Sequence, residues 1–201
     1  MGYLIYSMKN NKYKEDKTFL DDYWQRYQKI FFDSRNDSSI LEFRDSIKST
    51  LNNNGRLLFF GNGASASLCS HAATDFTKQA KIPAIAFNDH NLITALSNDY
   101  GYEYWVSKVI EYYGMHNDMV IFISVSGESP NLINGIKYAN NIGLNTGSLT
   151  GSEEENTLKK NSKNSLWVNS KAYNIVESIH TIWITLIIDL FVGSPEYMVN
   201  D

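Results

Sequence analysis

The sequence contains a single cysteine, Cys69, and no excess of basic residues. One cysteine cannot form an intrachain disulfide, and it cannot supply a cysteine-based zinc cluster. The formal net charge of −4 argues against a nucleic-acid-binding surface, which requires clustered lysine and arginine. We therefore expect a reducing compartment and a ligand much smaller than a nucleic acid.

The sequence also lacks a hydrophobic run long enough to cross a bilayer. The most apolar window, residues 179–192, contains His180 and Asp189 and is shorter than the ~20 residues that a membrane span needs. Residues 1–6 do not form a basic segment followed by an apolar stretch, as a signal peptide would. These features predict a cytoplasmic protein without a membrane partner, and a buried helix near its C-terminus.

Apolar periodicity indicates alternating strands and helices in a chain of 201 residues, the size of one domain. The pattern favours an α/β fold: a three-layer, doubly wound parallel sheet with helices on both faces and an N-terminal helical extension. Residues 151–165 are polar and charged, which indicates a solvated connection. The predicted divisions are a mobile segment 1–15, two helices in 16–54, the α/β domain 55–192 and a tail 193–201. The expected strands are 56–60, 84–87, 119–123, 146–149 and 166–168, and the expected later helices are 65–79, 130–141 and 175–191.

A serine-rich loop, residues 124–129, follows one of the buried strands and precedes a helix that begins with Pro130. Ser124, Ser126 and Ser129 can each donate a hydrogen bond to a phosphate oxygen, and the start of the helix attracts an anion. The alternative is a serine-rich turn with one helix cap. Glu128 is acidic, so its side chain is expected to point away from the anion or to contact a sugar hydroxyl.

A glycine turn, residues 61–65 (GNGAS), follows the other buried strand and allows a close approach of the backbone to a ligand. It lacks the glycine spacing of a dinucleotide-binding fingerprint and of a Walker loop, which argues against a nicotinamide or nucleoside triphosphate site. Read alone, the turn can be purely structural.

Four motifs together resemble the sugar isomerase (SIS) domain family, and within it the phosphoheptose isomerases. The resemblance covers about residues 55–192 and implies the flavodoxin-like SIS fold. The string from Asn98 to Glu103 is typical of the phosphoheptose isomerase subfamily. The motifs are residues 61–65, 92–103 (LITALSNDYGYE), 124–131 (SVSGESPN) and 149–151 (LTG).

The resemblance implies an aldose–ketose isomerase that converts sedoheptulose 7-phosphate to D-glycero-D-manno-heptose 7-phosphate, or handles a close sugar phosphate, through an enediol(ate). Such a protein would serve the synthesis of bacterial surface heptose, as in lipopolysaccharide or capsule. It would be a homotetramer with sites at subunit interfaces and N-terminal helices packed between subunits. The implied substrate-binding residues are Asn62 and Ser65 for the sugar, Asp89 near the sugar hydroxyls, and Ser124, Ser126 and Ser129 for the phosphate.

The catalytic positions that the resemblance implies are altered in this chain. A His and a Glu base four residues apart become His71 and Asp75, and a Gln and a His eight residues apart become Glu177 and Thr185. Asp75 and Glu177 are the expected catalytic carboxylates. His71, Asp75 and Glu177 are the expected ligands of one zinc ion, whereas His180 is interpreted as a packed helix histidine.

Threonine is neither a good zinc ligand nor titratable near neutral pH. Thr185 therefore leaves a second hypothesis open: a non-catalytic SIS protein that senses a sugar phosphate or acts as a scaffold.

Overall fold

A computed structural model of the chain describes residues 15–196. Of the predicted mobile segment 1–15 only Glu15 is described, and of the predicted tail 193–201 only residues 193–196. The described elements are α1 (Asp16–Asp33), α2 (Asp37–Asn52), β1 (Leu57–Gly61), α3 (Ala64–Lys78), β2 (Ala84–Ala86), α4 (His90–Tyr100), α5 (Trp105–Tyr113), β3 (Met119–Ser124), α6 (Pro130–Asn141), β4 (Asn145–Thr150), α7 (Thr157–Asn161), β5 (Asn164–Trp167) and α8 (Tyr173–Val192).

The strands form one parallel sheet in the order β2-β1-β3-β4-β5. Every residue of β1 and β3 is buried, because helices cover both faces of the sheet. Such strands are nearly continuous apolar runs, and this made them visible in the sequence. The predicted doubly wound α/β fold is confirmed.

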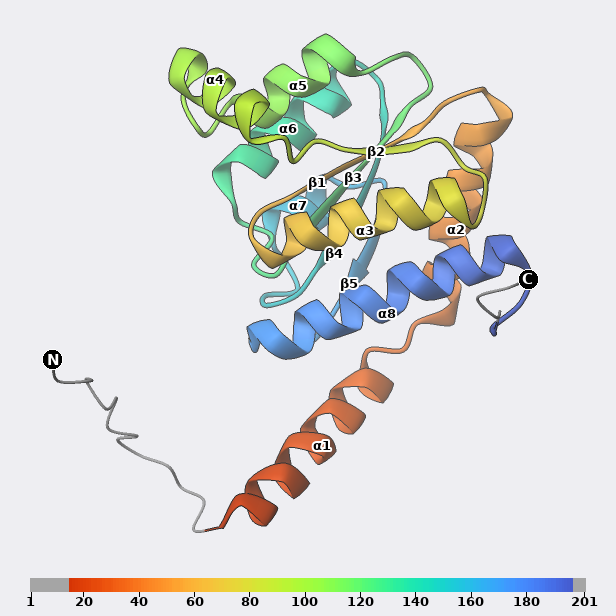
Figure 1. The fold of residues 1–201 in the computed structure, drawn as a ribbon, viewed down its shortest axis with the longest axis vertical. Coiled ribbons are helices and arrows are strands. Elements are labelled where there is room, and N and C mark those ends of the chain that lie inside the picture. Colours follow the sequence, from red (N-terminus) through yellow and green to blue (C-terminus); the bar gives the residue numbers. More distant parts are fainter. Residues whose placement is uncertain (1–14, 197–201) are drawn as a thin grey trace, which may run out of the picture.

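Alternate strand residues face two separate cores. Leu57 and Phe59 pack with α2, α3 and α8 on one face, whereas Leu58 and Phe60 pack with α5, α6 and α7 on the other. Figure 1 shows α3 and α8 crossing the same side of the sheet. Helix α8 is long and apolar enough to cross a membrane by length and composition. Eight of its residues are buried in this protein, however, so core packing accounts for its apolar character.

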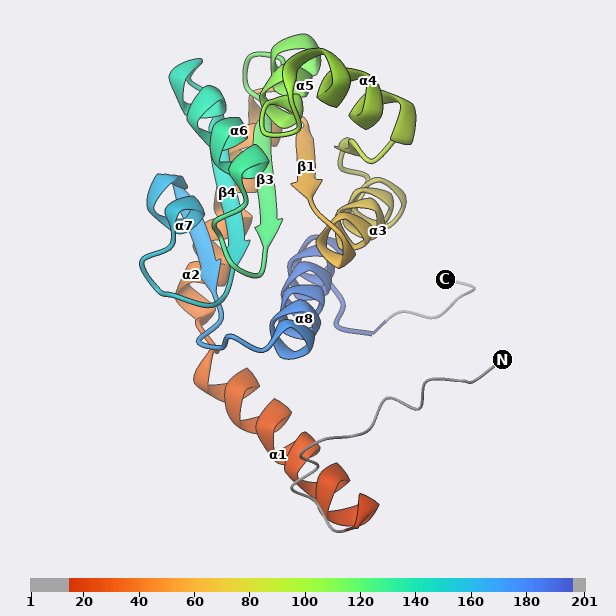
Figure 2. The same cartoon turned by 90° about the vertical axis from the view of Figure 1, so that its left-hand side faces the viewer.

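Helix α1 stands apart from the sheet and its covering helices (Figures 1 and 2). None of its residues is buried, although it contacts α8. The region 16–54 contains the two predicted helices, separated at residues 34–36, and the Asn36 side chain caps α2 by accepting a hydrogen bond from Ser39 N at 3.1 Å. The apolar side of α1 is therefore largely uncovered within one protomer.

The prediction that residues 151–165 form only a solvated connection was wrong. This segment contains α7, and Asn156 and Leu158 are buried against the rest of the domain. A five-residue helix with one apolar side chain carries no readable period, which explains why the sequence pattern did not reveal it.

The order of the strands places a topological switch between β1 and β3. The chain leaves β1 toward β2 on one side and returns to β3 on the other side of β1. In sheets of this type ligands bind at the carboxyl ends of the strands beside the switch. The glycine turn follows β1 and the serine-rich loop follows β3, so both lie at this position.

Candidate functional site

The glycine turn brings the backbone of β1 close to the start of α3. An added Cβ at Gly61 would lie 2.7 Å from the carbonyl carbon of Ser65, so a larger residue does not fit. Gly63 caps α3 with a φ of 56°, a left-handed conformation that favours glycine. The turn thus places the N-terminal end of α3 at the edge of the sheet, where Ser65 N donates to Asn62 O at 3.1 Å and Ala66 N donates to Gly63 O at 3.0 Å.

The serine-rich loop, hereafter the anion loop (residues 124–129), is held open by hydrogen bonds between its own members. Ser124 Oγ accepts a bond from Gly127 N at 3.1 Å, and Ser126 Oγ accepts one from Glu128 N at 3.2 Å. Ser129 is the N-cap of α6, but its side chain makes no capping bond. The hydroxyl hydrogens of these serines can therefore be donated to an anion.

Two asparagines join the glycine turn to the start of α6. Asn62 Nδ2 donates to Asn131 Oδ1 at 3.0 Å, and Asn131 Nδ2 donates to Asn62 Oδ1 at 2.9 Å. The Tyr102 hydroxyl also donates to Asn62 Oδ1, at 3.1 Å. The sequence motifs included Asn131 and Tyr102 but gave no role for either, because the contacts span long separations along the chain.

The glycine turn and the anion loop line a cavity of about 260 Å³, the loop cavity. The N-terminal ends of α3 and α6 both face this region, and their dipoles favour a negative charge. None of the described residues that line it is lysine or arginine, so an anion here would be held by N–H and O–H donors. The lining residues are Asn62, Gly63, Ala64, Ser65, Ile123, Ser124, Val125, Ser126, Ser129, Tyr173 and Glu177.

A second cavity of about 420 Å³, the helix cavity, lies between α1, α3 and α8. It shares Ala64, Ser65 and Glu177 with the loop cavity, so the two cavities adjoin each other. Its lining residues are Tyr27, Ala64, Ser65, Ser67, Leu68, His71, Asn174, Glu177, Ser178, His180 and Thr181. The arrangement suits an elongated ligand with an anionic group at one end.

His71 and Asp75 form a hydrogen-bonded pair one helical turn apart on α3. His71 Nε2 lies 2.8 Å from Asp75 Oδ2. His71 lines the helix cavity, whereas Asp75 does not, so Asp75 stands behind the imidazole. Burial, and to a smaller extent the nearby charge of Asp75, raise the pKa of the Asp189 carboxyl on α8.

The expected zinc ligands do not assemble within one protomer. Among residues 15–196 there is no group of three His, Cys, Asp or Glu side chains arranged to hold a metal ion. His71 and Asp75 contact each other, but Glu177 does not complete a triad with them. His71 and Glu177 both line the helix cavity, whereas Asp75 does not, so these three residues of one chain do not form a three-ligand cluster.

Two other expected positions lie away from the cavities. Asp89 is exposed and caps α4, where its side chain accepts a hydrogen bond from Leu92 N at 3.0 Å. Thr185 is exposed, and its hydroxyl donates to Thr181 O at 2.9 Å. Neither residue lines the loop cavity or the helix cavity.

His180 is fully buried on α8, as the packed interpretation expected. Its Nε2 lies 3.1 Å from Thr150 O, which makes Nε2 the protonated nitrogen of a neutral ring. Burial lowers the pKa of His180 to about 4, and the hydrogen bond to Thr150 opposes this effect only in part. His180 is consequently neutral near pH 7.

Comparison with known proteins agrees with these features. Residues 21–151 match the SIS domain model. The chain is 38% identical over 141 residues to the phosphoheptose isomerase of Thermodesulfovibrio yellowstonii, which covers 67% of this chain and 70% of that protein. A phosphoheptose isomerase of Helicobacter pylori strain HPAG1 is 36% identical over 146 residues, 70% of this chain and 76% of the relative.

A solved structure of the phosphoheptose isomerase from Neisseria gonorrhoeae shares the fold. Its TM-score to this chain is 0.82 at 24% identity, and the match covers 89% of this chain and 100% of that one. The chain therefore belongs to the phosphoheptose isomerase family of SIS-domain proteins, as its four motifs predicted.

Proposed function

We propose that this chain is an aldose–ketose isomerase that converts sedoheptulose 7-phosphate to D-glycero-D-manno-heptose 7-phosphate for bacterial surface heptose. The position of Glu177 carries this proposal. Glu177 lines both cavities, so its carboxylate stands between the donors for a phosphate and the region beside His71. Family membership supports the same reaction, since the relatives named above are phosphoheptose isomerases.

The reaction moves one proton between two neighbouring carbons. A base removes a proton from C1 of the ketose, which gives an enediol(ate), and the proton is returned to C2 while a hydroxyl proton moves from O1 to O2. In this proposal the Glu177 carboxylate moves the carbon-bound proton. Asp75 orients His71 through their 2.8 Å contact, and His71 transfers the hydroxyl proton between the sugar oxygens O1 and O2. The anion loop holds the phosphate and fixes the distance from that end of the sugar to Glu177.

Turnover of sedoheptulose 7-phosphate, followed by NMR of the aldose product, tests the proposal. We expect Glu177→Gln to lower kcat roughly 10²- to 10⁴-fold, the usual contribution of a positioned base. Glu153→Gln is the matched control, since it makes the same change on an exposed residue outside both cavities and should leave kcat unchanged. Full activity of Glu177→Gln would overturn the assignment of the base.

A second candidate function is binding of a sugar phosphate without turnover, as a sensor or scaffold. The observation that favours it is Thr185, which carries no titratable group and hydrogen-bonds within its own helix. In that case the wild-type protein would bind sedoheptulose 7-phosphate through the anion loop and form no product. Detection of product excludes the strictly non-catalytic form.

We further propose a homotetramer in which α1 packs between subunits. Leu20, Trp24 and Phe32 on α1 are 52%, 66% and 57% exposed, an unusual exposure for large apolar side chains on one helix. Tyr27 on the same helix lines the helix cavity, so a change in the packing of α1 would reshape the site.

A cytoplasmic location remains part of this proposal and agrees with the single buried cysteine. Zinc stays a prediction from the resemblance. No step of the mechanism above passes through a metal, because the described residues of one protomer do not form a ligand set.

A further inference from the structure

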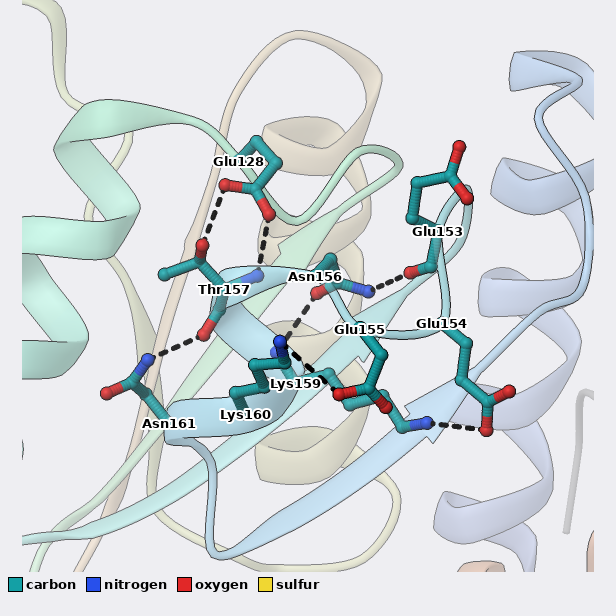
Figure 3. A network of polar contacts seen from close by, with 9 residues as sticks. All are labelled: Glu128, Glu153, Glu154, Glu155, Asn156, Thr157, Lys159, Lys160 and Asn161. Carbon is teal, nitrogen blue, oxygen red and sulfur yellow. Dashed lines mark hydrogen bonds and ion pairs between the residues drawn. The ribbon is translucent and has the colours of Figure 1, made fainter.

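Glu128 is an acidic residue inside a loop built to hold an anion, and its side chain is turned away to α7. Its Oε1 accepts a hydrogen bond from Thr157 N at 2.7 Å, and its Oε2 accepts one from the Thr157 hydroxyl at 2.8 Å (Figure 3). Both carboxylate oxygens are thus engaged by the first residue of α7. The carboxylate acts as a helix cap supplied from 29 residues away.

The backbone of the anion loop is attached to the same part of the chain. Leu158 N donates to Gly127 O at 3.1 Å, and Gly151 N donates to Val125 O at 3.0 Å. Two carbonyl oxygens of the loop therefore accept hydrogen bonds, one from α7 and one from the residue that follows β4. These two bonds fix the backbone of the loop at Val125 and Gly127.

Buried Asn156 supports the loop from behind. Its Nδ2 donates to Thr150 Oγ1 at 3.1 Å and to Glu153 O at 2.8 Å, and its Oδ1 accepts a bond from Lys159 N at 3.0 Å. Gly127 has a φ of 69°, and a Cβ there would lie 2.0 Å from Asn156 Oδ1. The loop thus rests directly on the asparagine.

The remaining acidic residues of this segment are matched by lysines. These surface pairs contribute little to stability. Their lysines offset the negative charge that the three glutamates would otherwise place near the anion loop. Glu128 has no lysine in its contacts and instead uses the donors of Thr157. The pairs are Glu153 with Lys171, Glu154 with Lys159 at 3.2 Å, and Glu155 with Lys160 at 3.3 Å.

We propose that Glu128 is a positioning residue for phosphate binding: its bonds to Thr157 fix the anion loop on α7 and keep the serine hydroxyls aimed at the phosphate. This inference rests on the proposed phosphate site of the anion loop. It predicts that removal of a negative charge beside an anion weakens binding, the reverse of what charge alone would give.

The test compares Glu128→Ala, Glu128→Gln and Thr157→Val with the wild-type protein. The dissociation constant of inorganic phosphate is measured by calorimetry, and KM and kcat are measured with sedoheptulose 7-phosphate. We expect Glu128→Ala to raise the phosphate dissociation constant and KM on the order of tenfold, as for lost hydrogen bonds to a charged group, with kcat little changed. Glu128→Gln can still accept from Thr157 N and should recover most of the affinity.

Glu154→Ala is the matched control, because it removes the same charge from an exposed residue of the neighbouring segment. Unchanged or tighter phosphate binding by Glu128→Ala, or an equal effect of Glu154→Ala, would overturn the inference. If Glu128→Ala does not fold, Thr157→Val takes its place, because it removes one of the two bonds to Glu128. Weaker phosphate binding by Thr157→Val would then support the inference, and unchanged binding would overturn it. Failure of the wild-type protein to bind phosphate would instead refute the phosphate site, so the two failures are distinguishable.

Discussion

Acidification should destabilise this protein through His180, which is neutral in the folded chain. Burial lowers the pKa of His180 from its ordinary value of 6.5 to about 4. Below pH 6.5 the unfolded chain binds a proton at this residue, whereas the folded chain stays unprotonated until about pH 4. Stability is therefore fully present above pH 6.5 and is lost progressively as the pH falls toward 4.

The magnitude follows from the difference between the two pKa values. Each pKa unit corresponds to about 1.36 kcal/mol, so the depression of His180 removes about 3 kcal/mol between pH 7 and pH 4 and about 2 kcal/mol by pH 5. A loss of this size is a substantial part of the ~5–15 kcal/mol that stabilises an ordinary domain.

Urea denaturation of the wild-type protein and of His180→Gln, at pH values from 7 to 4.5 and one protein concentration, isolates the effect. Glutamine can still donate to Thr150 O but does not titrate. Carboxylates titrate alike in both proteins, so the stability difference between them should shift by about 2 kcal/mol in favour of the variant on going from pH 7 to pH 5. A difference that does not change with pH would refute a buried, neutral His180.

Two further predictions concern the anion loop and the α1 surface. Gly127→Ala should weaken phosphate binding on the order of tenfold or prevent folding, because its Cβ would lie 2.0 Å from Asn156 Oδ1. Calorimetry with phosphate measures the affinity, and circular dichroism measures folding. A folded variant with wild-type affinity would contradict the prediction. Trp24→Glu should shift the protein to smaller oligomers, whereas Lys29→Glu, on the same helix, should not. Light scattering measures the mass of each variant. An unchanged mass for Trp24→Glu would argue against packing through α1.

Local sequence patterns predicted those parts of the fold whose signal is local. The two strands buried on both faces were visible as short apolar runs, and the helix starting at Pro130 was marked by its proline. The segment 151–165 was misread because α7 is short and its burial depends on Asn156, whose partners lie in β4 and in its own turn.

Within the site, too, the sequence predicted the features that are local along the chain and missed the contacts between distant residues. The serines of the anion loop could be found from their order along the chain, but the contact of Glu128 with Thr157 and that of Asn62 with Asn131 could not. Those contacts depend on which loops the sheet brings together. Asp89 was expected near the sugar, although an Asp just before a helix is equally a good N-cap, and capping is the role it has within the protomer.

The place of α8 along the chain has a consequence for synthesis. This helix begins at Tyr173, after all five strands, yet it covers one face of the sheet and carries Glu177. A nascent chain that has completed its strands therefore still exposes the surfaces of α2, α3 and β4 that α8 covers, until α8 has left the ribosome. Nascent chains at this stage should be strong clients for chaperones, and ligand binding can begin only when the last helix has docked.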